Sequence, residues 1–342
     1  MKLRSPALVA GLLCAALAGC STPADRAATT AGAAQPTASV SSVADLRIAF
    51  FTTSGNDYVA AGITSAEETA RELGVSLDVF DNGFDTGRQI DQVQTALASG
   101  KYNAFVVEPL DGRLLCGPIR DQALAQGILV SVTNGPLCGR DAENGDGTRE
   151  PGTITYVGGQ TPAFWEQWLA AMTAAHPDGA TIGLVAGPDI MANTTNFYAA
   201  ADELDPAKYR VVARTATDYT TAQAFQATQS MLAANPEIDV VMSAYSGMTQ
   251  GVLEALGIRA GSVSVYDVGA SGWATQAVRD GRLAMTAALL PASEARYGIT
   301  AIVDTVEGRP VPAHVDLNAL DVLPANQPFI TRDNVDAFRP QY

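Results

Sequence analysis

The stretch RIAFFTTSGNDYVAAGITSAEETARELG, residues 47–74, decides the fold of this chain. It begins with an apolar run, turns through polar residues, and continues with apolar residues on one face of a predicted helix that stops at Gly74. Further strands are predicted at residues 76–80 and 104–107, with a second one-sided helix between them that ends at residues 99–100. Apolar strands that alternate with one-sided helices indicate a parallel β-sheet covered on both faces.

The same unit recurs in the second half of the chain. Strands like the first three are predicted at residues 181–185, 209–213 and 238–242. The second helices agree in register at a spacing of 135 residues (225 − 90), which pairs Ile90 with Phe225, Val93 with Thr228 and Leu97 with Leu232. At the same spacing, residues 84–86 correspond to residues 219–221. The sequence therefore predicts an α/β protein with two similar doubly wound lobes and a ligand cleft at the carboxyl ends of their strands.

Composition and charge exclude several classes of function. The chain has 342 residues, 47% of them hydrophobic and 17% charged, which gives room for two domains with cores of their own. Its formal net charge of −15 disfavours binding to nucleic acid, because such binding needs a basic face that neutralises phosphates. The same charge disfavours electrostatic binding to an anionic membrane surface.

The N-terminus is typical of an export signal. Lys2 and Arg4 precede an apolar run, residues 7–18, that is too short for an ordinary membrane span. The run ends in Leu17-Ala18-Gly19-Cys20, which resembles the lipobox of bacterial lipoproteins. The resemblance implies cleavage before Cys20 and lipidation of its thiol; the alternative is an ordinary secretory signal. Residues 21–44 are rich in Ala, Thr, Ser and Pro and are predicted to be a disordered tether to the membrane.

Two cysteines in the body of the chain are expected to form a disulfide. Cys116 follows the third predicted strand, and Cys138 follows the next one, residues 128–132. Export places both in an oxidising compartment, and adjacent parallel strands bring the two loops to one edge of the sheet. The alternative is a pair of buried thiols. We expect no metal site here, because two cysteines without a nearby histidine are a poor ligand set.

A polar, Gly-rich insertion at residues 139–152 separates the fourth strand from a strand predicted at residues 153–157. Its acids, Asp141, Glu143 and Asp146, do not have the spacing of a calcium loop, so a solvated loop is expected. Gly158-Gly159 is typical of a hinge into the second lobe. In the helix that follows, we expect residues 168–169 to face the core and residue 164 or 165 to lie at the mouth of the cleft.

Three passages resemble the sugar-binding subfamily of type I periplasmic binding proteins, the ribose and galactose type. They are residues 85–109, with Asp85-Thr86-Gly87-Arg88-Gln89-Ile90 and Val107-Glu108-Pro109; Val265-Tyr266-Asp267-Val268-Gly269; and residues 278–291, with Val278-Arg279-Asp280-Gly281-Arg282-Leu283. The order of elements agrees over residues 47–338. The resemblance implies two lobes joined by a three-segment hinge, with an N-terminal lobe of residues 45–156 plus 290–322 and a C-terminal lobe of residues 157–289 plus 323–342.

The resemblance also implies a set of ligand-binding residues. The matching positions are Asn56, Tyr58, Asn134, Asn193, Tyr219, Tyr245 and Asp267. The chain departs from the family pattern where an Asp-Arg pair, a second Arg and a Gln are replaced by Asn134-Gly135, Asn193 and Leu289. Recognition of hydroxyl groups by charged, bidentate side chains is thereby weakened. Aromatic faces combined with Asn side chains and the carboxylate of Asp267 still suit a sugar or polyol.

Motifs for catalysis and cofactors are not found in the sequence. His176 and His314 are the only histidines, and neither follows a predicted strand end of the cleft, as a Ser–His triad would require. Residues 269–273 differ from a nucleophile elbow, because Trp273 stands where the last Gly belongs. No phosphate loop occurs, and we expect no enzyme activity and no cofactor.

The sequence leaves three functions open. The favoured one is a monomeric, lipid-anchored receptor that delivers a sugar or polyol to the permease of an ABC importer. The second is a sensor that presents its ligand-bound form to a membrane receptor, and the third is a secreted glycoside hydrolase. A sugar-responsive repressor is disfavoured, because residues 1–44 contain no DNA-binding headpiece.

Overall fold

The computed structural model describes residues 40–53 and 55–342, so the predicted signal segment and Cys20 lie outside the described residues. The folded body begins earlier than the sequence indicated. Val43–Asp45 form a short 3-10 helix, η1, whose N-cap Ser42 accepts a hydrogen bond from the Ala44 N–H. Val40 and Val43 pack against the core of the first lobe. The prediction that the tether extends to residue 44 is therefore wrong at its C-terminal end.

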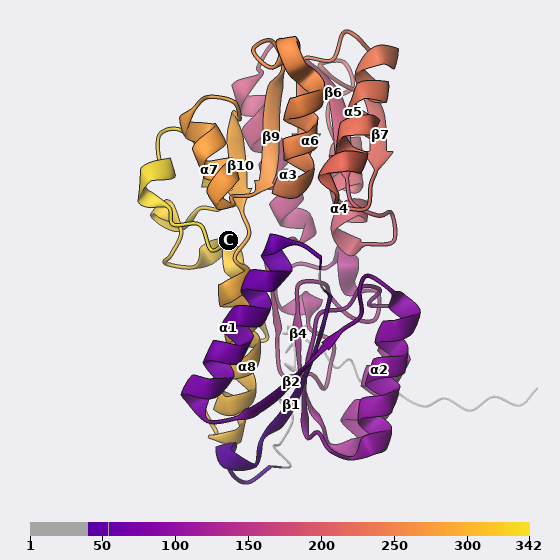
Figure 1. Cartoon of the computed structure of the whole chain (residues 1–342), viewed down its shortest axis with the longest axis vertical. Coiled ribbons are helices and arrows are strands. Elements are labelled where there is room, and N and C mark those ends of the chain that lie inside the picture. Colours follow the sequence, from indigo (N-terminus) through magenta and orange to yellow (C-terminus); the bar gives the residue numbers. More distant parts are fainter. Residues whose placement is uncertain (1–39, 54) are drawn as a thin grey trace, which may run out of the picture. The chain divides into compact units, whose positions relative to one another are not determined.

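The first lobe is built on a parallel sheet of six strands in the order β11-β5-β4-β3-β1-β2. The strands are β1 (Arg47–Thr52), β2 (Ser76–Asp81), β3 (Ala104–Val107), β4 (Leu129–Thr133), β5 (Tyr156–Gly158) and β11 (His314–Asp316). Its long helices are α1 (Asp57–Leu73), α2 (Thr86–Ser99) and α8 (Pro291–Val306). Figure 1 shows α8 lying beside α1, although the two are far apart in the sequence. Two apolar cores cover the two faces of the sheet.

The second lobe has a sheet of six strands in the order β12-β10-β9-β8-β6-β7. The strands are β6 (Ala180–Ala186), β7 (Tyr209–Ala216), β8 (Val240–Ser243), β9 (Ser264–Gly269), β10 (Met285–Ala288) and β12 (Phe329–Ile330). All neighbours pair in parallel except β10 and β12. The helices are α3 (Pro162–Ala175), α4 (Ala192–Asp202), α5 (Thr221–Ala234), α6 (Ser246–Leu256) and α7 (Gly272–Arg279).

The chain crosses between the two sheets after β5, after β10 and between β11 and β12. The predicted fold class, two doubly wound lobes joined by three segments, is confirmed. The predicted lobe boundaries at 289/290 and 322/323 lie in these connections, whereas the boundary at 156/157 lies inside β5. The crossovers are tightly packed, because a Cβ on Gly158 would lie 2.3 Å from the Tyr156 hydroxyl and one on Gly159 2.9 Å from the Asn318 side chain.

The predicted internal repeat is present in the backbone. Helix α2 begins at Thr86 and α5 at Thr221, again 135 positions apart (221 − 86). The N-cap side chain of each helix accepts a hydrogen bond from the amide three residues on. The residue before each cap has a left-handed backbone, with φ of 61° at Phe84 and 67° at Tyr219. The repeat therefore includes an unusual turn conformation as well as the helix register.

One prediction about the second lobe is wrong. Trp165 is fully buried and stacks on Phe197 with ring centroids 5.1 Å apart, and Phe164 is buried next to it. Neither ring lies at the cleft mouth, because helix α3 packs against α4 across this aromatic cluster. Trp168 and Leu169 face the core as expected.

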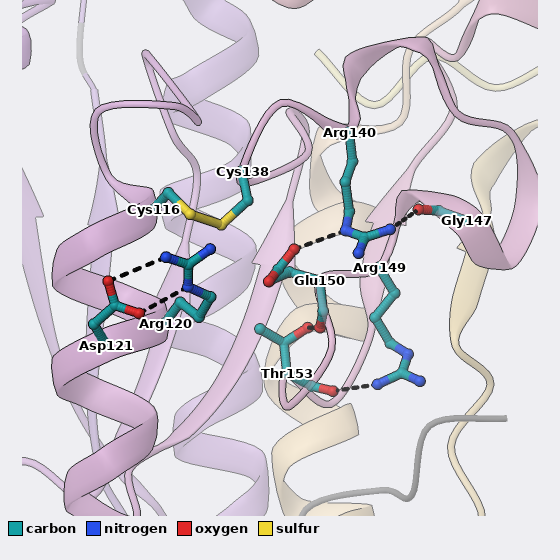
Figure 2. Close-up of polar contacts among 9 residues, drawn as sticks. All are labelled: Cys116, Arg120, Asp121, Cys138, Arg140, Gly147, Arg149, Glu150 and Thr153. Carbon is teal, nitrogen blue, oxygen red and sulfur yellow. Dashed lines mark hydrogen bonds and ion pairs between the residues drawn. A yellow bond between two sulfur atoms is a disulfide. The ribbon is translucent and has the colours of Figure 1, made fainter. Parts of the chain in front are cut away.

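The insertion at residues 139–152 is an ordered segment with two 3-10 turns, η4 (Arg140–Ala142) and η5 (Gly145–Thr148). Figure 2 shows the Cys116–Cys138 disulfide at its start, with Cα atoms 4.8 Å apart, so the expected pairing is present in the structure. Arg140 Nε donates to the buried Glu150 carboxylate at 2.7 Å, and Arg140 Nη1 donates to the Gly147 carbonyl at 3.0 Å. This partly buried ion pair and the disulfide give the segment a defined shape, which an ordinary solvated loop does not have.

The insertion also contacts the second lobe. Asn196 of α4 donates through Nδ2 to the Asp141 carbonyl at 2.8 Å, and the Ala163 N–H at the start of α3 donates to Asn144 Oδ1 at 3.0 Å. Within residues 40–53 and 55–342, no group of three or more acidic, His or Cys side chains is arranged to hold a metal ion. A membrane-spanning helix is likewise not found in the described part of the chain.

Candidate functional site

A central cavity of about 60 Å³ lies between residues of the two lobes at the carboxyl ends of their strands. The first lobe contributes the segments after β1, β2, β3 and β4, the second lobe contributes those after β6, β7, β8 and β10, and the crossover after β5 contributes Gln160. Its lining residues are Thr53, Asn56, Tyr58, Val59, Phe84, Glu108, Pro109, Leu110, Asn134, Gln160, Met191, Asn193, Tyr219, Ala244, Tyr245 and Leu289. This is the place where open parallel sheets bind ligands.

Two larger cavities adjoin the central one, because both share Leu110 and Met191 with it. A side cavity of about 430 Å³ extends along the insertion and the start of α4, and a mouth cavity of about 820 Å³ extends over the starts of α1 and α5. Sites for small molecules commonly measure about 300–1,000 Å³. A monosaccharide-sized ligand therefore needs the central cavity to widen, either by extending into its neighbours or by separation of the lobes.

Three of the predicted ligand residues come from the first lobe. Asn56 is the N-cap of α1, and its side-chain oxygen accepts a hydrogen bond from the Val59 N–H at 3.0 Å. The side-chain nitrogen of Asn56 takes no part in this hydrogen bond. Asn134 follows β4 with φ of 62°, and its Nδ2 donates to the Tyr58 hydroxyl at 2.9 Å. The Tyr58 hydroxyl in turn donates to Glu294 at the start of α8. These side chains form one polar chain along the first-lobe wall.

Two acidic residues beside this wall have raised pKa values. Glu108, directly after β3, has a raised pKa because burial disfavours its charged form, although a hydrogen bond from Thr52 at 2.6 Å opposes the shift. Burial and the nearby charge of Glu108 raise the pKa of Glu294 to about 8. Burial, with the charge of Glu294, also raises the pKa of the Tyr58 phenol, so Tyr58 remains a hydrogen-bond donor at neutral pH.

The second lobe contributes the opposite wall. Asn193 Nδ2 lies 3.1 Å from the Tyr219 hydroxyl and 3.4 Å from Gln160 Oε1. The Tyr219 ring meets the Tyr245 ring edge to face with centroids 5.9 Å apart, and the centroid of the Phe84 ring of the first lobe lies 6.3 Å from that of Tyr219. Burial raises the pKa of Tyr219 to about 12. Neutral amides and aromatic rings therefore make up this side of the cavity.

Asp267 is not where the sequence analysis placed it. Its side chain is fully buried, is absent from the lining of the central cavity, and accepts from the hydroxyls of Ser246, Thr249 and Thr286. Burial raises its pKa to about 6, while these hydrogen bonds act in the opposite direction. The expectation that Asp267 faces the cleft is therefore wrong. The carboxylate instead connects β9 to α6 and β10 inside the second lobe.

Six of the seven predicted ligand positions line the central cavity: Asn56, Tyr58, Asn134, Asn193, Tyr219 and Tyr245. Phe84, Glu108 and Gln160 also line the cavity and are not among the predicted ligand residues. The 135-residue repeat could have identified Phe84, because it occupies the position equivalent to Tyr219. Glu108 could have been found as the polar residue directly after β3. Neither histidine lines the cavity; His314 lies in β11, with Nε2 3.0 Å from the Gly158 carbonyl.

The two lobes and the cleft at their strand ends define a solute-binding protein of the type I periplasmic class. The family model described as a periplasmic binding protein domain matches residues 48–310, which is well over half of the chain. The chain therefore belongs to the periplasmic binding protein domain family.

Among curated proteins, the ribose import binding protein of Salmonella typhimurium is 23% identical over 263 residues. The match covers 76% of this chain and 84% of that protein. These relatives are named as binding proteins, and the class to which the chain belongs is one of solute-binding proteins rather than enzymes.

Solved structures agree with the fold. A solute-binding protein of Mycobacterium smegmatis with bound glycerol is 25% identical, with a TM-score of 0.70 over 85% of this chain and 96% of that one. A periplasmic solute-binding protein of Actinobacillus succinogenes with bound D-allose is 20% identical, with a TM-score of 0.72 over 86% and 100% of the two chains. A Bacillus halodurans protein with bound myo-inositol is 16% identical, with a TM-score of 0.73 over 89% and 100%.

Proposed function

We propose that this protein is an extracytoplasmic receptor that closes its two lobes on a small sugar or polyol and delivers it to the permease of an ABC importer. The observation that carries the proposal is the central cavity, where Asn56 and Asn134 of one lobe lie across from Asn193 of the other. Amide groups on both walls can pair with hydroxyls around one small ring, so the bound ligand favours the arrangement in which both lobes contact it.

The aromatic side chains support the same ligand class. Tyr58, Tyr219 and Tyr245 line the cavity together with the amides. Their rings can cover the C–H faces of a sugar or cyclitol while the amides reach its hydroxyls. Ribose, D-allose, myo-inositol and glycerol, the ligands that the relatives and neighbours are named for or hold, are all small and polyhydroxylated.

A thermal-shift screen with sugars and polyols, followed by calorimetry, tests this function. A ligand that binds the folded state alone adds about 2.7 kcal/mol of stability at a hundredfold excess over its dissociation constant. We expect Tyr219→Ala to weaken binding of the identified ligand at least tenfold, because the ring forms one wall of the cavity. Tyr297→Ala is the matched control, since Tyr297 is exposed on α8 and does not line the cavity. Failure of every neutral and amino-substituted polyol to bind at millimolar concentration would refute the function.

We further propose that the protein is held at the cell membrane only through a lipid on Cys20, as a monomer on a flexible tether. The support is the lipobox-like Leu17-Ala18-Gly19-Cys20 and the polar residues behind it. Cys20→Ala is expected to release the protein from membranes or to leave the precursor uncut. Cys14→Ala is the matched control, because Cys14 lies within the apolar run rather than at its end. Unchanged membrane attachment of the Cys20 variant would contradict the anchor.

A further inference from the structure

The central cavity contains one charged side chain, and that side chain is acidic. Among the described residues that line it, Glu108 is the only one that carries a formal charge, and no Lys, Arg or His is present. Thr52 Oγ1 donates to one carboxylate oxygen of Glu108 at 2.6 Å. Within residues 40–53 and 55–342, no basic side chain forms an ion pair with Glu108. An ionised carboxylate in such a place lacks the counter-charge that buried charges normally have.

A second acid beside Glu108 also lacks a basic partner. Glu294 is 5% exposed, lines a small adjoining cavity together with Glu108, and likewise has no ion pair with a described basic residue. Its hydrogen-bond donors, the Tyr58 hydroxyl and Asn134, are neutral and supply no positive charge. Two carboxylates near each other without a cation repel one another when both are ionised. The first-lobe wall of the cleft is therefore deficient in positive charge.

The aromatic rings independently favour a positive ligand. Tyr58, Phe84, Tyr219 and Tyr245 all line the central cavity with Glu108. The face of an aromatic ring carries partial negative charge and attracts a cation within about 6 Å, more strongly where water is excluded. A cavity with four such rings and a carboxylate, but without a basic residue, favours a cationic nitrogen over a carboxylate or phosphate group.

The outer cavities have the same bias. Acidic residues around the central, side and mouth cavities are Asp57, Glu108, Asp111, Asp141, Asp189 and Asp218, whereas Arg113 is the only basic one among the described residues that line them. This ratio of six acids to one base exceeds the 36 to 21 of the whole chain. Clefts lined by charges of one sign concentrate ligands of the opposite sign and raise their association rates.

We infer that the ligand of this cleft is an amino-substituted polyol, such as an amino sugar or aminocyclitol, whose protonated nitrogen lies against Glu108 while its hydroxyls meet Asn56, Asn134 and Asn193. This inference rests on the proposed function and narrows its ligand class. An acidic sugar is disfavoured, because its carboxylate would meet Glu108 without a cation between them.

Paired probes test the inference by calorimetry. D-glucosamine is compared with D-glucose, and an aminocyclitol with myo-inositol, on the mature protein and on two variants. We expect the amine of at least one pair to bind at least tenfold more tightly than its hydroxyl analogue. In Glu108→Gln, which keeps an oxygen for the Thr52 hydrogen bond, this preference should fall about 10- to 100-fold, the loss typical of a charged hydrogen bond. Glu67→Gln, on the exposed face of α1, removes the same charge away from the cavities and should keep the preference.

The outcomes separate the two proposals. Binding of neutral polyols with no preference for their amino analogues overturns the inference and leaves the proposed function standing. A preference that Glu108→Gln and Glu67→Gln reduce equally also overturns it, since a general field effect rather than contact with Glu108 would then be responsible. Absence of binding by any of these probes overturns the inference, and absence of a ligand in the thermal-shift screen as well contradicts the proposed function. Circular dichroism of both variants establishes that they are folded before affinities are compared.

Discussion

Each lobe contains an acidic residue at or near a strand end; Asp267 is fully buried and Glu108 is partly buried, and the two acids have different surroundings. Asp267 in β9 of the second lobe is fully buried and accepts from the hydroxyls of Ser246, Thr249 and Thr286. Glu108 after β3 of the first lobe has one hydroxyl donor, Thr52, and lines the central cavity. The acid whose hydrogen bonds are supplied within its own lobe has a structural role. Glu108, which has one such donor, can accept further hydrogen bonds from a ligand.

The largest effect that distinguishes the two acids is expected from Asp267→Ala. The substitution leaves the hydroxyls of Ser246, Thr249 and Thr286 without their shared acceptor in a site closed to water. Since each buried hydroxyl left unpaired costs about 1–3 kcal/mol, we expect unfolding to become easier by about 3–6 kcal/mol. Denaturant titration with a constant m-value measures the loss.

Glu108→Ala is the matched variant for that comparison. It leaves a single buried hydroxyl, that of Thr52, without its acceptor, so we expect its free energy of unfolding to fall by about 1–2 kcal/mol, less than in Asp267→Ala. Equal losses of stability in the two variants would remove the distinction between a structural and a ligand-facing acid. A stable Asp267→Ala protein would return Asp267 to the set of candidate ligand residues.

The misplacement of Asp267 shows what the sequence could predict. The alternation of strands and helices, and the 135-residue repeat, predicted the two sheets because those signals are local and periodic. The resemblance predicted six cavity residues because each lies in the loop or helix start that follows a strand, and strand ends meet at one edge. The side chain of Asp267 is buried among hydroxyl groups from α6 and β10. These groups are distant in the sequence, so the pattern of residues around β9 does not predict the contact. Glu108 was read as part of the Val107-Glu108-Pro109 motif rather than as a side chain in the cavity.

The pH dependence of the free energy of unfolding tests whether the first-lobe wall lacks positive charge. The pKa of Glu294 is raised from 4.5 to about 8, mainly by burial. Its contribution to stability is therefore fully present below pH 4.5 and is lost as the pH rises through 8. At 1.36 kcal/mol per pKa unit the upper limit of this loss is about 5 kcal/mol.

Glu294→Gln keeps an acceptor for the Tyr58 hydroxyl and removes the titration. We expect the free energy of unfolding of the variant to be about 2 kcal/mol higher than that of the wild type at pH 8.5, and to differ little from it at pH 4. Thermal melts across this pH range make the comparison. A wild type whose stability rises between pH 5 and pH 8 relative to the variant would contradict the prediction, since that slope would require a lowered pKa.

The smallest expected effect on stability concerns Phe84, which is equivalent to Tyr219 in the internal repeat. Phe84 and Tyr219 both have a left-handed backbone, which costs a non-glycine residue about 1 kcal/mol, yet both positions hold large rings. Asn tolerates this conformation better, and Phe84 is 40% exposed, so Phe84→Asn gives up little buried surface. We expect its free energy of unfolding to change by less than about 1 kcal/mol, while affinity for the identified ligand falls about tenfold because one wall of the cavity is lost. Denaturant titration and calorimetry on the same sample separate the two quantities. If Phe84→Asn lowers stability strongly and leaves affinity unchanged, the ring serves the fold, and the strained turn that the two lobes share has no part in binding.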